Sequence, residues 1–331
     1  MTEAAAPGGG ARLTEAAAPT GLETAFGELR GHLLGLLYRL TGSRADAEDL
    51  VQATFERALS RPPADTSRPW RPWLVRVALN LGRDHLRRRR RRAYDGPWLP
   101  EPLEIPDPGA SPRAEVPPGF FAEPAGTEGR YELLESVSFA FLVALETLTP
   151  TQRAVLLLRD VFEYSGRETA EALELSEAGV RQHLHRARRA LADYERGAGP
   201  RRRLDEAAVQ DILGRFLGAL AGGDVAAVEA LLAEDVVLRT DAGGEFHAAR
   251  VDVAGRNKVA RFYVNISKLA GMPRAAIRTL NGAPAVISEL DEPKPGIAPR
   301  VVTLVDLDAE GRLARIYAVL ASAKLAGIDP L

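Results

Sequence analysis

The spacing of the hydrophobic residues changes near Gly197–Pro200, and this change limits the possible folds more than any other feature of the sequence. Up to Tyr194, apolar residues recur every three or four positions, which is the spacing of helices buried along one side. Beyond Pro200, helical segments give way to short apolar runs that are separated by turn residues. A single all-helical or all-strand domain is therefore excluded. The sequence predicts helical domains followed by an α+β domain.

A second division lies inside the helical part. Residues 95–128 contain nine of the 23 prolines, too many for a helix or a central strand, and are rich in acidic residues. Residues 1–20 repeat the string TEAAAP and contain almost no large apolar side chains, which is typical of disorder. We therefore predict a disordered tail (1–20), a helical domain (21–94), a proline-rich acidic linker (95–130), a second helical domain (131–196) and an α+β domain (201–331).

Caps and turn residues divide these domains into elements. In the first helical domain we expect helices over 22–40, from Ser43 to about 59, and from Pro72 through the arginines. Four more are expected between 131 and 194. In the α+β domain we expect helices over 204–221, 225–233 and 256–268, and strands over 236–240, 275–281, 284–290, 300–307 and 312–320.

The composition excludes several classes of site. The 331 residues include no cysteine, which excludes disulfides, thiol nucleophiles, iron–sulfur clusters and cysteine-based zinc sites. The five histidines are scattered, so we expect neither a metal nor a cofactor. The sequence has no apolar stretch of about 18 residues and no signal-peptide pattern near its start, which predicts a cytoplasmic protein without membrane contact.

Three patterns carry candidate functional residues, and the first is the string ADAEDLVQ at residues 45–52. On a helix, Leu50 and Val51 would face the core while a polar face remains for a partner. That face consists of Asp46, Glu48, Asp49 and Gln52. A simpler interpretation is a helix start whose acids are favoured by the helix dipole.

The second pattern is a basic helix that Trp73-Leu74 opens and that ends in six consecutive arginines at 87–92. Arginine pairs with phosphate, and flat aromatic side chains stack on unpaired bases, so the combination favours a nucleic-acid strand. The candidate residues are Trp73, Asn80, Arg83, Asp84, Arg87, Arg88, Arg89 and Arg90. The alternative is a solubilising basic helix end.

The third pattern is a helix-turn-helix, with a first helix over 167–173, a turn at Glu174-Leu175, and a second helix that Ser176 caps. The second helix carries residue types that can meet base edges and phosphates in a major groove. These are Ser176, Glu177, Arg181, Gln182, His185, Arg186, Arg188 and Arg189. A helical hairpin without a role in DNA binding remains the alternative.

Taken together and in this order, the three patterns resemble the extracytoplasmic-function sigma factors of bacterial RNA polymerase over residues 22–194. The resemblance implies that the acidic helix docks on the clamp helices of the polymerase beta-prime subunit. It also implies that the basic helix melts and reads the minus-ten promoter element, and that residues 148–193 read the minus-thirty-five element. Core RNA polymerase and promoter DNA are then the expected partners, and the protein is not an enzyme.

A narrower resemblance rests on the linker string YDGPWLPEP at 94–102, in which Trp98, Leu99 and Pro100 form the central motif. It is typical of sigma factors fused to a SnoaL-like domain with the cone fold of nuclear transport factor 2. The implied fold is two all-α sigma domains, a region 2 bundle and a region 4 helix-turn-helix, followed by that α+β cone. The implied role of the cone is control in cis, without a dedicated anti-sigma factor.

Two motifs of the fused domain depart from the usual pattern of this group. DGGGK stands here as DAGGE at 241–245, and NPDKL stands as ASAKL at 321–325. The candidate regulatory residues are Asp241, Gly243, Gly244, Lys324 and Leu325.

Other functions remain open at this stage. Related cones include enzymes that use an Asp/His pair, for which Asp241 and His247 are candidates, and the cone could instead sense a small ligand in a pocket with Phe262, Tyr263 and Tyr317. A dimeric operator-binding regulator would need only the helix-turn-helix.

Overall fold

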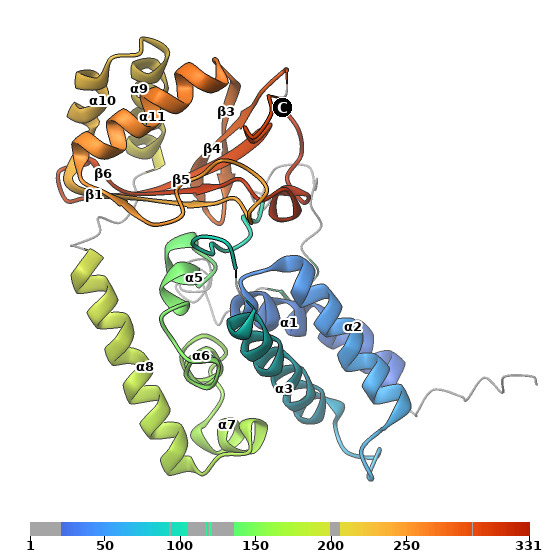
Figure 1. Ribbon diagram of the computed structural model, residues 1–331. Coiled ribbons are helices and arrows are strands. Elements are labelled where there is room, and N and C mark those ends of the chain that lie inside the picture. Colours follow the sequence, from blue (N-terminus) through green and yellow to red (C-terminus); the bar gives the residue numbers. More distant parts are fainter. Residues whose placement is uncertain are drawn as a thin grey trace, which may run out of the picture.

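The computed structural model describes residues 21–92, 94–104, 117, 119–120, 136–198, 206–292 and 294–331. Figure 1 shows helical domains on one side and a sheet with its own helices on the other. This arrangement confirms the predicted multidomain fold, all-α followed by α+β. The expected tail and most of the proline-rich linker lie outside the described residues. Within them, no helix is long and apolar enough to cross a membrane.

Three helices form the first helical domain: α1 (Leu22–Thr41), α2 (Arg44–Ser60) and α3 (Trp70–Arg91). Gly42, at φ +73°, ends α1, and the Ser43 side chain caps α2 by accepting from the Asp46 amide at 3.1 Å. The third helix starts two residues before Pro72, where the sequence predicted its beginning. A proline fits there because the first turn of a helix needs no intrahelical N–H donor.

The second helical domain contains α5 (Phe139–Leu145), α6 (Pro150–Leu156), a π-helical turn (Leu157–Val161), α7 (Gly166–Leu173) and α8 (Glu177–Ala198). Capping boxes start α6 at Thr149 and α7 at Ser165. The left-handed residue Glu174 (φ +55°) ends α7 and turns the chain into α8. The predicted helix-turn-helix is therefore present.

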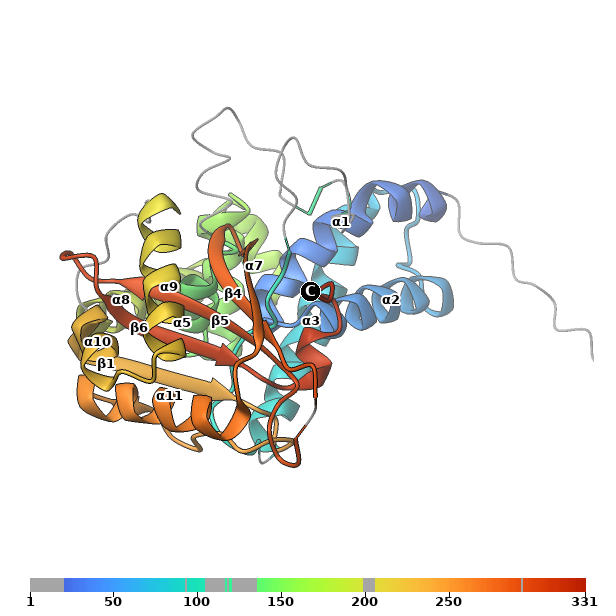
Figure 2. The same ribbon diagram turned by 90° about the horizontal axis from the view of Figure 1, so that it is seen from above.

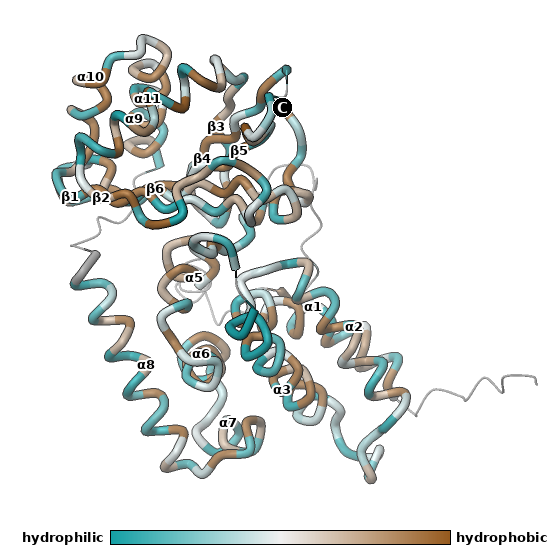
Figure 3. The backbone as a smooth tube through the Cα atoms, viewed as in Figure 1, coloured by the Kyte–Doolittle hydropathy of each residue, from teal (hydrophilic) through white to brown (hydrophobic). Residues whose placement is uncertain are grey.

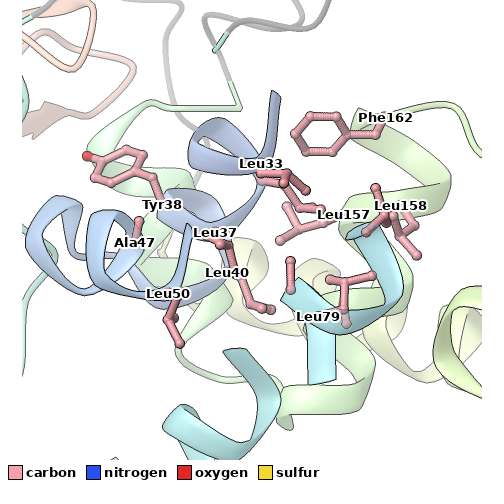
Figure 4. Packing of buried hydrophobic residues seen from close by; sticks show 14 of the residues in the cluster. Leu33, Leu37, Tyr38, Leu40, Ala47, Leu50, Leu79, Leu157, Leu158 and Phe162 are labelled. Atoms are coloured by element: carbon pink, nitrogen blue, oxygen red, sulfur yellow. The ribbon is translucent and has the colours of Figure 1, made fainter. Parts of the chain in front are cut away.

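The two helical domains share one hydrophobic core. Leu33, Leu37 and Leu40 of α1 and Leu79 of α3 belong to the same buried cluster as residues of the second domain, among them Leu157, Leu158 and Phe162 (Figure 4). Since burying apolar side chains contributes most of the stability of a fold, this common core holds the two domains together. We call this packing of the two helical domains against each other the closed arrangement.

The C-terminal domain is a six-stranded sheet with three helices. It contains α9 (Glu206–Ala221), α10 (Val225–Leu231), β1 (Leu232–Asp241), β2 (Val253–Ala254), α11 (Arg256–Ala270), β3 (Arg274–Leu280), β4 (Ala283–Glu289), β5 (Arg300–Leu307), β6 (Leu313–Val319) and a 3₁₀ turn (Ser322–Leu325). The strand order is β2-β1-β6-β5-β4-β3, and only β1 and β6 run parallel.

The sheet buries both of its faces. Helices α9, α10 and α11 cover the face turned away from the helical domains, where they enclose a core with Val236, Leu238 and Ile316 (Figures 1 and 2). On the other face, Leu99 of the linker and Phe139 of α5 pack among Val302, Tyr317 and other residues of the sheet. The C-terminal domain therefore lies directly on the linker and the second helical domain.

Candidate nucleic-acid interface and linker site

The acidic face of α2 is open to solvent. Glu48, Asp49 and Gln52 are exposed, whereas Leu50 and Val51 are buried, as the sequence predicts. Asp46 is half-buried, with an oxygen 3.4 Å from Nε2 of His85 on α3. The α2 surface offers carboxylates and an amide to a partner.

The middle of α3 is covered by the second helical domain. Arg83 is buried, and its guanidinium donates to Oδ1 of Asn80 at 2.5 Å and to the carbonyl of Leu173 at the end of α7 at 3.4 Å. Burial, together with repulsion from Arg87, lowers the pKa of Arg83. Trp73 is half-buried and packs edge to face on Trp70, with ring centroids 6.0 Å apart.

The arginines at the end of α3 divide into two groups. Arg87 and Arg88 are exposed, and Arg87 pairs with Asp84 at 2.8 Å. Arg89 instead donates to the carbonyl of Thr41 at 2.7 Å and to Glu146 of the second helical domain at 2.6 Å, while Arg90 donates to the carbonyl of Leu148. Figure 3 shows this hydrophilic end of α3 close to the C-terminal domain.

Glu146 joins the two helical domains through a pair of cations. One of its oxygens accepts from Arg89, and the other accepts at 2.7 Å from Arg153, which is fully buried and also donates to the carbonyl of Leu40 at 2.8 Å. Burial works to raise the pKa of Glu146, but the two guanidinium groups outweigh it and hold the pKa below its usual value. We call Glu146, Arg89 and Arg153 the Glu146 cluster, which links the two helical domains through ion pairs.

The recognition helix α8 is free along its outer face. Its cap is formed by Ser176, whose Oγ accepts from the Gly179 amide at 3.0 Å. Arg188 forms a bidentate ion pair with Asp160, with N···O distances of 2.7 and 3.0 Å. The other candidates, Glu177, Arg181, Gln182, His185, Arg186 and Arg189, are exposed. The helix can therefore meet a groove without rearrangement of the second helical domain.

The backbone of linker residue Leu99 is held on both sides by the C-terminal domain. Its amide donates to Oδ2 of Asp241 at 2.7 Å, and its carbonyl accepts from Nζ of Lys324 at 2.5 Å. Lys324 also pairs with Asp241 at 2.5 Å, and the Tyr94 hydroxyl donates to the other Asp241 oxygen at 2.5 Å. We call this arrangement of Asp241, Lys324 and Leu99 the linker clamp. Asp241 is fully buried, and its charge is met by these donors.

Trp98 connects the clamp to the first helical domain. Two cations lie over its ring, with the Arg89 guanidinium 3.8 Å and the Lys324 ammonium 4.0 Å from the ring centroid. It also packs on Gly42, where a Cβ would come within 2.6 Å of the indole. Glycine is required at that position for this close approach as well as for its positive φ.

Further along the linker, Glu101 completes the start of α2. Its carboxylate accepts from the amide of Arg44 at 2.8 Å and from the hydroxyl of Ser43 at 3.2 Å, and its own amide donates to the carbonyl of Gly42 at 2.8 Å. A linker carboxylate thus lies at the positive end of the helix that carries the acidic face.

Asn281 is a contact that the sequence interpretation missed. Its side chain accepts from the Leu103 amide at 2.9 Å and donates to the Tyr38 hydroxyl at 2.9 Å and to the Val137 carbonyl at 2.8 Å. It therefore ties the C-terminal domain to the linker and to both helical domains. Asn281-Gly282 is a turn dipeptide, and no local signal in the sequence distinguishes a turn asparagine that is buried.

The variant motifs at 241–245 and 321–325 come together at the clamp. The Gly243 amide donates to Asp241 at 3.1 Å, and a Cβ on Gly244 would lie 3.3 Å from the carboxylate of Asp95. Glu245, which replaces the usual lysine, accepts from the Ser322 amide at 3.2 Å, and so joins the two motifs. Leu325 is buried under the sheet.

One sequence hypothesis about the cone, the acid–base pair, is wrong, and the ligand-pocket hypothesis is wrong for one of its three residues. Asp241 contacts the linker, whereas His247 lines a cavity on the helix-covered side of the sheet, so they do not form an acid–base pair. Tyr317 lies outside that cavity and packs on Phe139, with its hydroxyl 3.0 Å from Asp306. Phe262 and Tyr263 do line the cavity. Within the described residues, no cluster of three or more acidic or histidine side chains could hold a metal.

Comparisons with known proteins agree with this architecture. The family described as Sigma-70 region 2 matches residues 25–92, and the family described as Sigma-70, region 4, matches residues 138–191. The ECF RNA polymerase sigma factor SigJ of Mycobacterium tuberculosis is 36% identical over 250 residues, which are 74% of this chain and 73% of that protein. SigG of the same organism is 36% identical over 59% of this chain and 55% of its own length.

The crystal structure of SigJ from Mycobacterium tuberculosis superposes with a TM-score of 0.67 at 30% identity. The match covers 92% of this chain and 98% of that one, and thus extends through the C-terminal domain.

Proposed function

Because this chain belongs to the extracytoplasmic-function sigma factors of RNA polymerase, we propose that its C-terminal domain controls the sigma factor in cis by holding the linker. As a sigma factor the protein is not an enzyme: it directs core polymerase to promoters by reading the minus-ten and minus-thirty-five elements. Its partners are core polymerase and promoter DNA. The polymerase acts on the chromosome, so we assign the protein to the cytoplasm.

Each of the three candidate surfaces receives a role in this proposal. The α2 face docks on the beta-prime clamp helices of the polymerase through Asp46, Glu48, Asp49 and Gln52. The basic helix α3 engages the opened strand, with Trp73 and Asn80 beside bases and the arginines on phosphates. The outer face of α8 reads the upstream element, with Arg181 and Gln182 at base edges.

The linker clamp is the observation that carries the proposal of control in cis. It holds both backbone groups of Leu99, and a buried charge-assisted hydrogen bond is worth more than a neutral one. Trp98 and Glu101, on either side of Leu99, contact the first helical domain. By fixing Leu99, the C-terminal domain therefore also fixes the position of the linker against the first helical domain.

The direction of control follows from the shared core. The minus-ten and minus-thirty-five elements are, by their positions, about 25 base pairs apart, or roughly 85 Å along the duplex. A chain whose helical domains are packed together, with Arg83 against the carbonyl of Leu173, cannot place one domain on each element. The clamp favours this closed arrangement, so we propose that it represses, and that core polymerase must open the chain. A separate anti-sigma factor is then unnecessary.

The test uses purified full chain, core polymerase and a promoter library transcribed in vitro. Asp241→Asn and Lys324→Met weaken the clamp without removing the domain, and we expect both to raise promoter output and core affinity severalfold. Asp211→Asn and Lys258→Met remove the same charges from exposed positions in the same domain and should leave output unchanged. A chain that ends at Pro200 should also remain active. Lower output from both clamp variants, with core binding intact, would show that the clamp activates instead.

A further inference from the structure

The C-terminal domain contains an apolar cavity that the sigma function does not use. It lies between α9, α11 and the helix-covered face of the sheet, and has a volume of about 200 Å³. A cavity of about 150 Å³ with apolar walls is large enough to admit benzene. Met272 lines the cavity and is also 58% exposed, so the cavity reaches the surface there. A small molecule has both the space and a way in.

The chemistry of the walls defines the kind of molecule. As far as the structure describes the chain, no Asp, Glu, Lys or Arg lines the cavity, and most of its surface comes from side chains such as Leu217, Phe262, Ile266 and Val301. A charged ligand would lose its hydration without gaining a counter-ion. The ligand that fits is therefore neutral and mainly apolar.

Two neighbouring hydroxyl groups lie in the cavity. The hydroxyl of Tyr263 is buried beside that of Thr303, and both residues line the cavity. Because a hydroxyl can both donate and accept, this pair leaves hydrogen-bonding capacity for a ligand that carries one hydrogen-bonding group.

The cavity is connected to the linker clamp through two strands. Thr240 of β1 lines the cavity and the next residue, Asp241, grips the linker on the other side, as the alternation of side chains along a strand requires. Leu320, just after β6, also lines the cavity, and its amide donates to the Asp241 carbonyl at 2.7 Å. Four residues later the chain reaches Lys324. A molecule in the cavity therefore touches both strands that carry the clamp.

We infer that this cavity binds a neutral, mainly apolar molecule of one or two rings with one hydrogen-bonding group, and that the bound molecule strengthens the hold on the linker. The cavity has its shape while the linker is clamped, and a ligand favours the state to which it binds better. The regulatory half of this inference rests on the proposed function. The binding half does not.

The binding test uses 2-naphthol and naphthalene, which differ by one hydroxyl, titrated into the full chain. We expect saturable binding of both, with 2-naphthol the tighter. Tyr263→Phe should weaken 2-naphthol about fivefold and leave naphthalene unchanged, whereas the matched Tyr194→Phe outside the cavity should change neither. Ser288→Phe, which fills part of the cavity, should weaken both probes. If binding does not saturate, or if Ser288→Phe leaves the affinity of both probes unchanged, the cavity is not the binding site.

The regulatory test adds 2-naphthol to the in vitro transcription reaction. Output from the full chain should fall, and output from Asp241→Asn or from a chain that ends at Pro200 should not. Saturable binding without any effect on the full chain would overturn the coupling and leave the site in place. If 2-naphthol does not bind although Asp241→Asn still raises output, the inference fails and the proposed function stands.

Discussion

The arginine-rich helices α3 and α8 differ in how much of their basic surface is already engaged. On α8, Arg181, Arg186 and Arg189 are exposed and ready to meet DNA. On α3, Arg83 and Arg89 contact the second helical domain, and Arg89 also stacks on Trp98 of the linker. The closed arrangement therefore covers α3, the helix proposed to read the minus-ten element, more than α8, the helix proposed to read the minus-thirty-five element. Composition alone would have treated the two helices alike.

The largest expected effect comes from removing the carboxylate of the Glu146 cluster. Glu146→Gln removes the counter-ion of Arg89 in the first helical domain and of the buried Arg153, which also holds the Leu40 carbonyl. Because removing one partner of a buried pair leaves the other charge uncompensated, the contact between the helical domains should be destabilised by about 3 kcal/mol. The chain has no cysteine, so dyes attached through Glu56→Cys and Glu195→Cys can report the opening by energy transfer.

The control for this change is Glu171→Gln, which removes an exposed pair with Arg167 and should cost less than about 0.5 kcal/mol. Equal energy transfer in Glu146→Gln and Glu171→Gln would mean that the apolar core alone keeps the domains together.

The next effect is a pH dependence at the same interface. His32 of α1 lies beside Phe162 and Tyr164 of the second helical domain, and burial, with the charges of Arg71 and Arg39, lowers its pKa to about 4. The stability that neutral His32 contributes is complete above pH 6.5 and is lost as the pH falls toward 4, because the open chain takes up the proton first. Closure should weaken by about 2 kcal/mol between pH 7.5 and pH 5.

Energy transfer between the same two dyes measures this change as well. His32→Asn removes the titrating group, so the difference between the wild-type chain and this variant isolates histidine from the carboxylates that begin to titrate near pH 5. An identical pH profile in both chains would exclude His32 as the cause.

The local parts of this structure could be predicted from the sequence, and the long-range parts could not. Helical spacing, the caps at Ser43 and Ser176 and the turn at Glu174-Leu175 act within a few residues, and they locate the elements to within a few positions. The short strand β2 has too few residues to show a period.

The residues that join the domains have no such local signal. Arg89 and Arg90 look like the other arginines of the run, yet their partners Glu146 and Leu148 lie more than 50 residues away. The motif residues of the C-terminal domain could be named from the family resemblance, but only the fold places Asp241 and Lys324 on the two backbone groups of one linker residue.

The smallest expected difference tests the independence of α8 from closure. Arg181→Ala should cost about 1–3 kcal/mol in promoter binding by holoenzyme and relax the preference at one base pair, whereas Arg189→Ala, if it contacts phosphate, should weaken all sequences alike and reduce the salt dependence. Because the outer face of α8 is exposed in the closed chain, each cost should be the same within about 0.5 kcal/mol in the Asp241→Asn background, as expected for distant sites. Competition binding with single-base promoter variants measures both. A cost for Arg181→Ala that changes when the clamp is weakened would mean that the C-terminal domain also acts on the upstream reader, and the contrast between α3 and α8 would fail.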